Sequence, residues 1–298
     1  MSDQKENTGK PVNKDAIELY NVYIHGDLPR RDFLRKLAGI AGSAAAATML
    51  LPLLEPNYVF AQQVATDDDR LETGYVEYSG GNGLVKAYFA KPAGQSGKLP
   101  GVLVIHENRG LNAHIEDVAR RAALAGYVAL APDGLTYVGG ALEDQEASRD
   151  LFGQSDGERI SADVIAGVPY LAARSDCSGK LGSVGFCYGG GVALQCAAAY
   201  PDIIGAGVCF YGSPLDREQI AQVKAPLMMH YAGEDERINA TIPEFRALLD
   251  EFKIAYSLHM YPGTGHGFHN DSSAARYNEA ASKLAWQRTL NLFAGSLS

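Results

Sequence analysis

A cysteine flanked by glycines is the first feature of this sequence that could do chemistry. Cys187 lies in the run GFCYGG, with Gly185 two residues before it and Gly189 two residues after it. That spacing lets a nucleophile sit on a tight turn between a strand and a helix, where larger flanking side chains would collide. The flanks fit, since residues 180–184 read as a short buried strand and residues 191–200 as a small, apolar helix. We expect a nucleophilic thiol here; the alternative is a structural turn with an ordinary buried cysteine.

An acid and a histidine follow the cysteine in an order that matters. Asp235 comes just after a predicted strand, and His266 lies in the glycine-rich loop TGHGFH after a later strand. The order nucleophile, acid, histidine is that of the α/β-hydrolases. His266 would accept the thiol proton and return it to the leaving oxygen, while Asp235 would orient the imidazole and stabilise its cation. Two alternatives stay open: Asp235 could only cap a helix, and His269 could be the base.

Alternating strand and helix patterns should position these residues. Continuous apolar runs indicate strands buried on both faces, as in a parallel sheet, and active residues are then expected at the carboxyl ends of the strands. We predict an α/β-hydrolase fold with a mostly parallel, doubly wound sheet and an N-terminal β-hairpin. The predicted hairpin strands are 74–78 and 85–90, and further strands are expected at 101–105, 127–132, 181–186, 206–211, 226–231 and 255–261, with helices at 114–125 and 273–293.

The N-terminal part resembles an export signal. Arg30 and Arg31 precede a moderately apolar run at 37–54, as in twin-arginine signals, and Ala61 ends a small-x-small cleavage pattern. We therefore expect a signal peptide over residues 1–61, a single domain over residues 62–298, and a periplasmic or otherwise exported product that meets the membrane only during export. An uncleaved anchor is the alternative, and residues 1–28 carry no fold signal.

Charge and cysteine content limit the partners. The chain of 298 residues has a formal net charge of −9. Residues 1–61 carry seven basic and seven acidic side chains, so this charge belongs to the later part, and an acidic domain repels nucleic acid.

The cysteines, Cys177, Cys187, Cys196 and Cys209, lack zinc-site spacing, so we expect no metal or cofactor. We also expect no disulfide; a redox role for Cys187 with Cys196 or Cys209 is a third functional alternative. The oligomeric state is not predicted.

With the segment His106-Glu107-Asn108-Arg109-Gly110 at the end of the first buried strand, the sequence resembles the dienelactone hydrolase family from about residue 74 to 293. The resemblance implies hydrolysis of a lactone or ester through an acyl-cysteine on Cys187. It also implies that Glu107 helps to activate the thiol when substrate arrives, and that the backbone N–H groups of Asn108 and Tyr188 form the oxyanion hole. Alternatively, Glu107 pairs with Arg109 and only braces the loop.

One departure from the family concerns the substrate. Family members that bind a substrate carboxylate carry arginines in two loops, which here are residues 134–137 and 268–271 and contain none. A neutral ester, lactone or thioester is therefore at least as plausible as dienelactone. A general carboxylesterase or thioesterase, and a non-catalytic binding protein on a hydrolase scaffold, are the competing functions.

Overall fold

The structure is a computed structural model that describes residues 12–26, 28–56, 62–81 and 83–298. The chain divides into two compact units. The first comprises residues 1–57 together with residues 273–276, and the second comprises residues 58–272 and 277–298.

The described part of the first unit contains three helices, α1 (Lys14–Ile24), α2 (Arg30–Ala41) and α3 (Ala44–Leu54). Its small core combines aromatic and aliphatic side chains, with the rings of Tyr23 and Phe33 stacked 4.3 Å apart. The expectation that residues 1–28 carry no fold signal was wrong for α1. Its buried side chains recur with helical spacing, at Ala16, Tyr20, Tyr23 and Ile24, but charged and polar residues between them dilute the pattern.

The predicted export signal falls partly on α2 and α3. Arg30 and Arg31 open α2, and Gly42, with a φ of 83°, ends that helix. Among the described residues no single helix is long and apolar enough to cross a membrane; α2 and α3 reach that length and hydropathy together, but a bend of 107° separates them. The predicted cleavage site at Ala61 lies outside the described residues.

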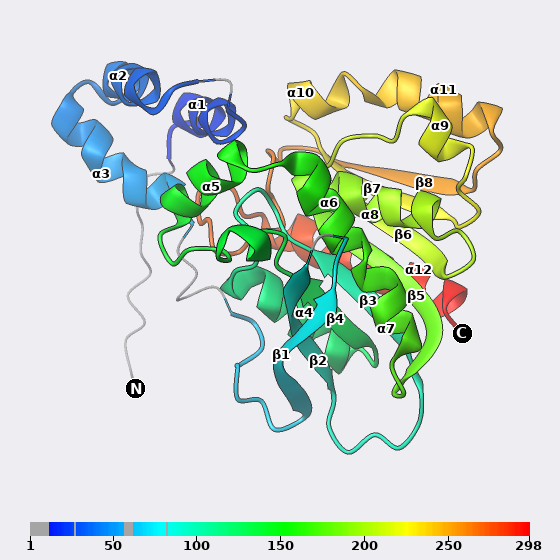
Figure 1. The fold of residues 1–298 in the computed structure, drawn as a ribbon. Coiled ribbons are helices and arrows are strands. Elements are labelled where there is room, and N and C mark those ends of the chain that lie inside the picture. The colour runs from blue at the N-terminus through cyan, green and yellow to red at the C-terminus, as the bar shows by residue number, and fades with distance from the viewer. Residues whose placement is uncertain (1–11, 27, 57–61, 82) are drawn as a thin grey trace, which may run out of the picture. The chain divides into compact units, whose positions relative to one another are not determined.

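The second unit is built on an eight-stranded sheet in the order β1-β2-β4-β3-β5-β6-β7-β8 (Figure 1). β1 and β2 form the predicted hairpin and, with β2 antiparallel to β4, make one antiparallel edge. All other neighbouring strands are parallel. This arrangement confirms the predicted α/β-hydrolase fold. The strands are β1 (Leu71–Ser79), β2 (Leu84–Pro92), β3 (Leu99–Ile105), β4 (Val128–Pro132), β5 (Cys177–Phe186), β6 (Ile204–Phe210), β7 (Leu227–Ala232) and β8 (Tyr256–Tyr261).

Helices cover both faces of this sheet and enclose two hydrophobic cores. Side chains of α4 and α12 pack in one core, and those of α6, α7, α8, α9 and α11 pack in the other. Because both faces are covered, the residues of the central strands are mostly buried, and most of them are apolar or glycine, as the sequence indicated. The helices are α4 (Ala113–Leu124), α5 (Gln145–Gln154), α6 (Gly157–Ile165), α7 (Gly167–Ala173), α8 (Tyr188–Ala199), α9 (Arg217–Ile220), α10 (Glu236–Asn239), α11 (Ile242–Glu251) and α12 (Glu279–Ser296).

The last helix begins six residues later than the sequence predicted. α12 begins at Glu279 instead of residue 273, because Asn278 caps it by accepting a hydrogen bond from the Ala281 N–H at 3.0 Å. Residues 273–276 belong to the first unit.

Candidate active site

Cys187 occupies the turn between β5 and α8. Its backbone has a φ of 55°, a left-handed conformation that is strained for any residue with a Cβ. The Cys187 N–H donates a 3.0 Å hydrogen bond to the Phe210 carbonyl at the end of β6, which holds the turn in place. This is the geometry expected for a nucleophile raised above the edge of a parallel sheet.

The two glycines around Cys187 are required by close packing. A Cβ on Gly185 would lie 1.8 Å from the Gly189 carbonyl oxygen, far inside van der Waals contact. A Cβ on Gly189 would lie 2.5 Å from the carbonyl oxygens of both Ile105 and His106. The first turn of α8 therefore packs directly on the backbone at the end of β3, and the predicted steric reason for the glycines is correct.

Asp235 and His266 meet as predicted, at the carboxyl ends of β7 and β8. The Nδ1 of His266 lies 2.6 Å from Oδ2 of Asp235, and both side chains are buried. The other carboxylate oxygen of Asp235 accepts a hydrogen bond from the Ile238 N–H at 3.4 Å and caps α10. Asp235 therefore both contacts the imidazole of His266 and caps a helix, the two possibilities that the sequence left open. Burial raises the pKa of Asp235, but the hydrogen bond to His266, the charge of that ring, the Ile238 N–H and the charge of Arg237 together outweigh burial and leave the pKa lowered.

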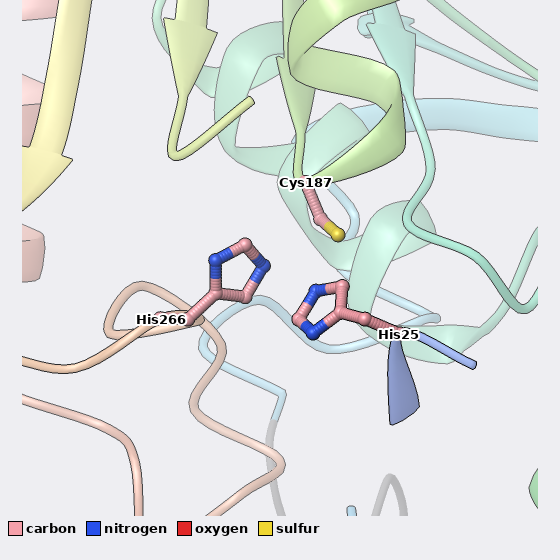
Figure 2. A group of neighbouring side chains, drawn as sticks. All are labelled: His25, Cys187 and His266. Atoms are coloured by element: carbon pink, nitrogen blue, oxygen red, sulfur yellow. The ribbon is translucent and has the colours of Figure 1, made fainter. Parts of the chain in front are cut away.

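The imidazole of His266 also faces the thiol. The Cys187 sulfur lies within 4.8 Å of a ring nitrogen of His266 (Figure 2). Since Nδ1 is engaged by Asp235, Nε2 is the nitrogen left for the thiol. Burial alone would lower the pKa of His266, but the negative charge of a Cys187 thiolate and the bond to Asp235 together raise it to about 9. A pKa of about 9 means that the His266 ring carries a proton at neutral pH.

Tyr211, which the sequence did not single out, packs against His266. The two ring centroids are 4.9 Å apart, and Tyr211 has a φ of 40° at the end of β6. Its N–H donates a 2.8 Å hydrogen bond to the His230 carbonyl of the neighbouring strand. A strained residue held in this way limits where the His266 ring can move.

His269, the competing base, is not part of this arrangement. Its ring is fully buried and stacks on Phe186 at 4.8 Å. Neither ring nitrogen has a hydrogen-bond partner among the described residues, and burial keeps its pKa well below the ordinary value. The structure therefore brings His266, and not His269, to the acid.

Glu107 lies in the loop after β3 and is buried. Its Oε2 accepts a 2.7 Å hydrogen bond from the side-chain amide of Asn270, four residues after His266. Arg109, the alternative partner suggested by the sequence, has its guanidinium 3.6 Å from the Glu146 carboxylate. The bond to Asn270 joins the loop after β3 to the loop that carries His266, and no local sequence pattern pointed to it.

The two predicted oxyanion donors lie on adjoining backbone segments. Tyr188 is the first residue of α8, so its N–H has no acceptor within the helix. Asn108 follows β3, whose end packs against Gly189. His106 is a third residue of this region: its Nδ1 lies 2.5 Å from the Glu107 carbonyl oxygen, and its Nε2 accepts a 3.1 Å hydrogen bond from the Gly134 N–H.

The remaining cysteines are buried free thiols. Burial raises the pKa of both Cys196 and Cys209 to about 12, which keeps them protonated and poorly nucleophilic. Within the described part of the second unit, no three histidine, cysteine or carboxylate side chains bring ligand atoms within 4.8 Å of one another.

Comparison with known proteins places these features in a family. The model of the dienelactone hydrolase family matches residues 85–297. A "Putative carboxymethylenebutenolidase" of Saccharolobus solfataricus is 31% identical over 249 residues, covering 71% of this chain and 94% of the relative. A "Probable 2-oxo-3-(5-oxofuran-2-ylidene)propanoate lactonase" of a Bradyrhizobium species is 35% identical over 227 residues, covering 68% and 86%.

Solved structures agree with this assignment. A structure described as a "Putative Dienelactone Hydrolase" from Klebsiella pneumoniae superposes with a TM-score of 0.67 at 28% identity, covering 75% of this chain and 98% of that one. A dienelactone hydrolase from Anabaena variabilis has the same fold, with a TM-score of 0.61 at 22% identity over 77% of this chain and 100% of that one. The chain is a hydrolase that belongs to the dienelactone hydrolase family.

Proposed function

We propose that the protein hydrolyses a small ester or lactone through an acyl-cysteine intermediate on Cys187. The observation that carries the proposal is the chain of contacts from Asp235 through His266 to the Cys187 sulfur. A weakly nucleophilic neutral thiol becomes a strong nucleophile as a thiolate, and the raised pKa of His266 supports that state.

In the first half of the reaction the thiolate sulfur attacks the substrate carbonyl carbon. A C–S bond forms, and the carbonyl π electrons move onto oxygen, where the N–H groups of Asn108 and Tyr188 are proposed to stabilise the charge. When the tetrahedral intermediate collapses, the C–O bond to the leaving oxygen breaks. That oxygen takes the Nε2 proton of the His266 imidazolium, leaving a neutral ring and a thioester.

The second half restores the enzyme. Neutral His266 removes a proton from a water molecule, and the resulting hydroxide attacks the thioester carbonyl. The C–S bond breaks, the carboxylic acid leaves, and the thiolate remains beside the protonated ring. Asp235 holds the ring in one orientation through both halves and stabilises its positive charge. Glu107 is proposed, from the family resemblance, as a second basic group recruited by the bound substrate.

We further propose that the preferred substrate is neutral. The loops of the site carry two buried carboxylates, Asp235 bonded to His266 and Glu107 bonded to Asn270, and His266 supplies a compensating positive charge. The guanidinium of Arg109, which could otherwise bind a substrate carboxylate, is buried next to Glu146. A substrate carboxylate would therefore add negative charge to the site without the bidentate arginine contact that usually compensates for such a charge.

Hydrolysis of dienelactone and of a neutral aryl ester by the purified protein tests the proposal, with Cys187→Ala as the matched variant. We expect the neutral ester to be turned over and the activity to disappear in Cys187→Ala. Activity that survives in Cys187→Ala would refute the nucleophile. A clear preference for dienelactone would refute the neutral-substrate proposal while leaving the chemistry intact.

We also propose that the protein is exported by the twin-arginine route. Arg30 and Arg31 before an alanine-rich apolar run support this proposal. That route carries folded proteins, which suits a chain with buried free thiols. Replacing both arginines by lysine should leave the protein in the cytoplasm, and unchanged export of that variant would contradict the proposal.

A further inference from the structure

His106 is a fully buried histidine that the proposed chemistry does not use. The hydrogen bonds around its ring assign its tautomer. The Gly134 N–H can only donate, so Nε2 of His106 is an acceptor and carries no proton. In the neutral ring the proton is then on Nδ1, which donates to the Glu107 carbonyl oxygen at 2.5 Å. Burial lowers the pKa of His106, which agrees with a neutral ring.

The Glu107 carbonyl belongs to the same peptide group as the Asn108 N–H. A trans peptide is planar, so its C=O and N–H point in opposite directions. A hydrogen bond that fixes the carbonyl therefore also fixes the direction of the N–H. Rotation of this peptide about its flanking bonds would turn the Asn108 N–H away, and it would break the short bond to the His106 ring.

The same ring contacts the other proposed donor. The rings of His106 and Tyr188 lie nearly parallel, with centroids 6.2 Å apart and an interplanar angle of 22°. Tyr188 follows Cys187, and the next residue, Gly189, packs on the His106 carbonyl. His106 thus touches both backbone segments from which the oxyanion donors come.

We propose that His106 is a positioning residue for the oxyanion hole, because its Nδ1–H holds the Glu107–Asn108 peptide in the orientation that presents the Asn108 N–H to the substrate. The inference rests on the proposed function, which assigns Asn108 as a donor. It predicts that the Nδ1 side of the ring matters for the transition state, and that the Nε2 side, which braces Gly134, does not.

Two substitutions separate the two sides of the ring. In His106→Asn the side-chain amide nitrogen takes the place of Nδ1 and can still donate to the Glu107 carbonyl. In His106→Gln the amide instead reaches the place of Nε2, where its oxygen can accept from Gly134, and the donor to Glu107 is lost. Each variant therefore keeps one of the two hydrogen bonds: His106→Asn keeps the bond to Glu107, and His106→Gln keeps the bond to Gly134.

Three readouts distinguish the oxyanion hole from the thiol. The first is kcat for a neutral aryl ester. The second is the affinity for an aldehyde analogue of that ester, which adds to Cys187 and places an oxyanion in the hole. The third is the rate of Cys187 alkylation by iodoacetamide, which needs the thiolate but no oxyanion donor. Losing an oxyanion donor costs about 100- to 1,000-fold in kcat, and we expect misorienting one to cost about 10- to 100-fold.

We expect His106→Gln to lower kcat and aldehyde affinity by about 10- to 100-fold, with the rate of Cys187 alkylation unchanged within about twofold. His106→Asn should restore kcat and aldehyde affinity to within about fivefold of the wild type. The reverse order, with Gln active and Asn impaired, would overturn the proposal in favour of a bracing role at Gly134. A parallel fall of all three readouts would overturn it too, because it would indicate damage to the thiol or the fold.

Two controls complete the design. His230 is a buried histidine with two hydrogen bonds, to Tyr261 and Thr289, on β7. His230→Asn should lower thermal stability without changing the ratio of aldehyde affinity to alkylation rate. If His106→Gln does not fold, His106→Asn decides alone: lost aldehyde affinity with normal alkylation would overturn the inference. Hydrolysis that persists in Cys187→Ala would instead mean that the proposed function, and not the role of His106, has failed.

Discussion

Replacing Cys187 by alanine should lower the pKa of His266 by more than one pH unit. In the native site this pKa is raised from 6.5 to about 9, although burial acts in the opposite direction. This rise corresponds to roughly 3 kcal/mol in favour of the protonated ring. Cys187 and Asp235 both contribute to it: the charge of Cys187 raises the pKa most, followed by the hydrogen bond to Asp235, the hydrogen bond to Cys187 and the charge of Asp235, in that order.

The size of the expected change follows from that ranking. At least half of the rise must come from the sulfur, and the burial that opposes the rise remains after the sulfur is removed. The pKa of His266 in Cys187→Ala should therefore lie below about 8. It should not be raised again by the remaining cysteines, whose thiols are buried and protonated.

Histidine ring signals followed by NMR during a pH titration would measure the change, with the His266 signal assigned from a His266→Gln sample. Cys209→Ala serves as the matched control, because it also removes a buried sulfur, but a neutral one, and should leave the midpoint near 9. A midpoint that stays near 9 in Cys187→Ala would refute the reasoning. It would mean that the thiol is neutral at rest and that Asp235 alone holds the proton on His266.

Three further outcomes follow from the same geometry. Because His266 keeps its proton up to about pH 9 and gives it to the leaving oxygen, kcat/KM for ester hydrolysis should fall above that pH, while iodoacetamide alkylation, which needs no proton donor, should not fall. Asp235→Asn should lower kcat by about 1,000- to 10,000-fold, and Asp235→Ala should in addition lose about 1 kcal/mol of stability in urea unfolding because the cap of α10 is removed. Gly185→Ala should cost about 3 kcal/mol or more, since its Cβ would overlap the Gly189 carbonyl, whereas Gly153→Ala, with no atom within 4 Å, should cost nothing measurable in the same assay.

The sequence predicted the sheet, and it predicted that Cys187, Asp235 and His266 lie close together, because both predictions rest on local patterns. Apolar runs indicate strands covered on both faces, and the structure buries all residues of β4 and β7 and most residues of β3, β5 and β6. Glycines at fixed distances from Cys187 indicate the turn, and the close contacts of Gly185 and Gly189 give the physical reason. The order of Cys187, Asp235 and His266 was informative because parallel strands bring their carboxyl ends to one edge of the sheet.

The supporting residues could not be predicted, because their contacts join distant parts of the chain. Asn270 bonds to Glu107 across 163 residues, and Gly134 bonds to His106 across 28. Nothing near either residue in the sequence indicates its partner. The positive φ of Tyr211 is likewise set by the packing of neighbouring strands, since tyrosine has no preference for that conformation. The catalytic roles and the export route stay predictions.

The ion pair that we propose between Cys187 and His266 changes what Glu107 can contribute. The proton leaving Cys187 goes to the stronger base, and His266 binds a proton with a pKa of about 9. A ring nitrogen of His266 faces the sulfur, so His266 is the base placed to take the proton at rest. Glu107 is meanwhile held by Asn270, on the loop that carries His266. Before substrate arrives, its contribution is therefore to join the His266 loop to the loop of the proposed oxyanion donor Asn108. A role in proton transfer requires that the substrate first separate it from Asn270.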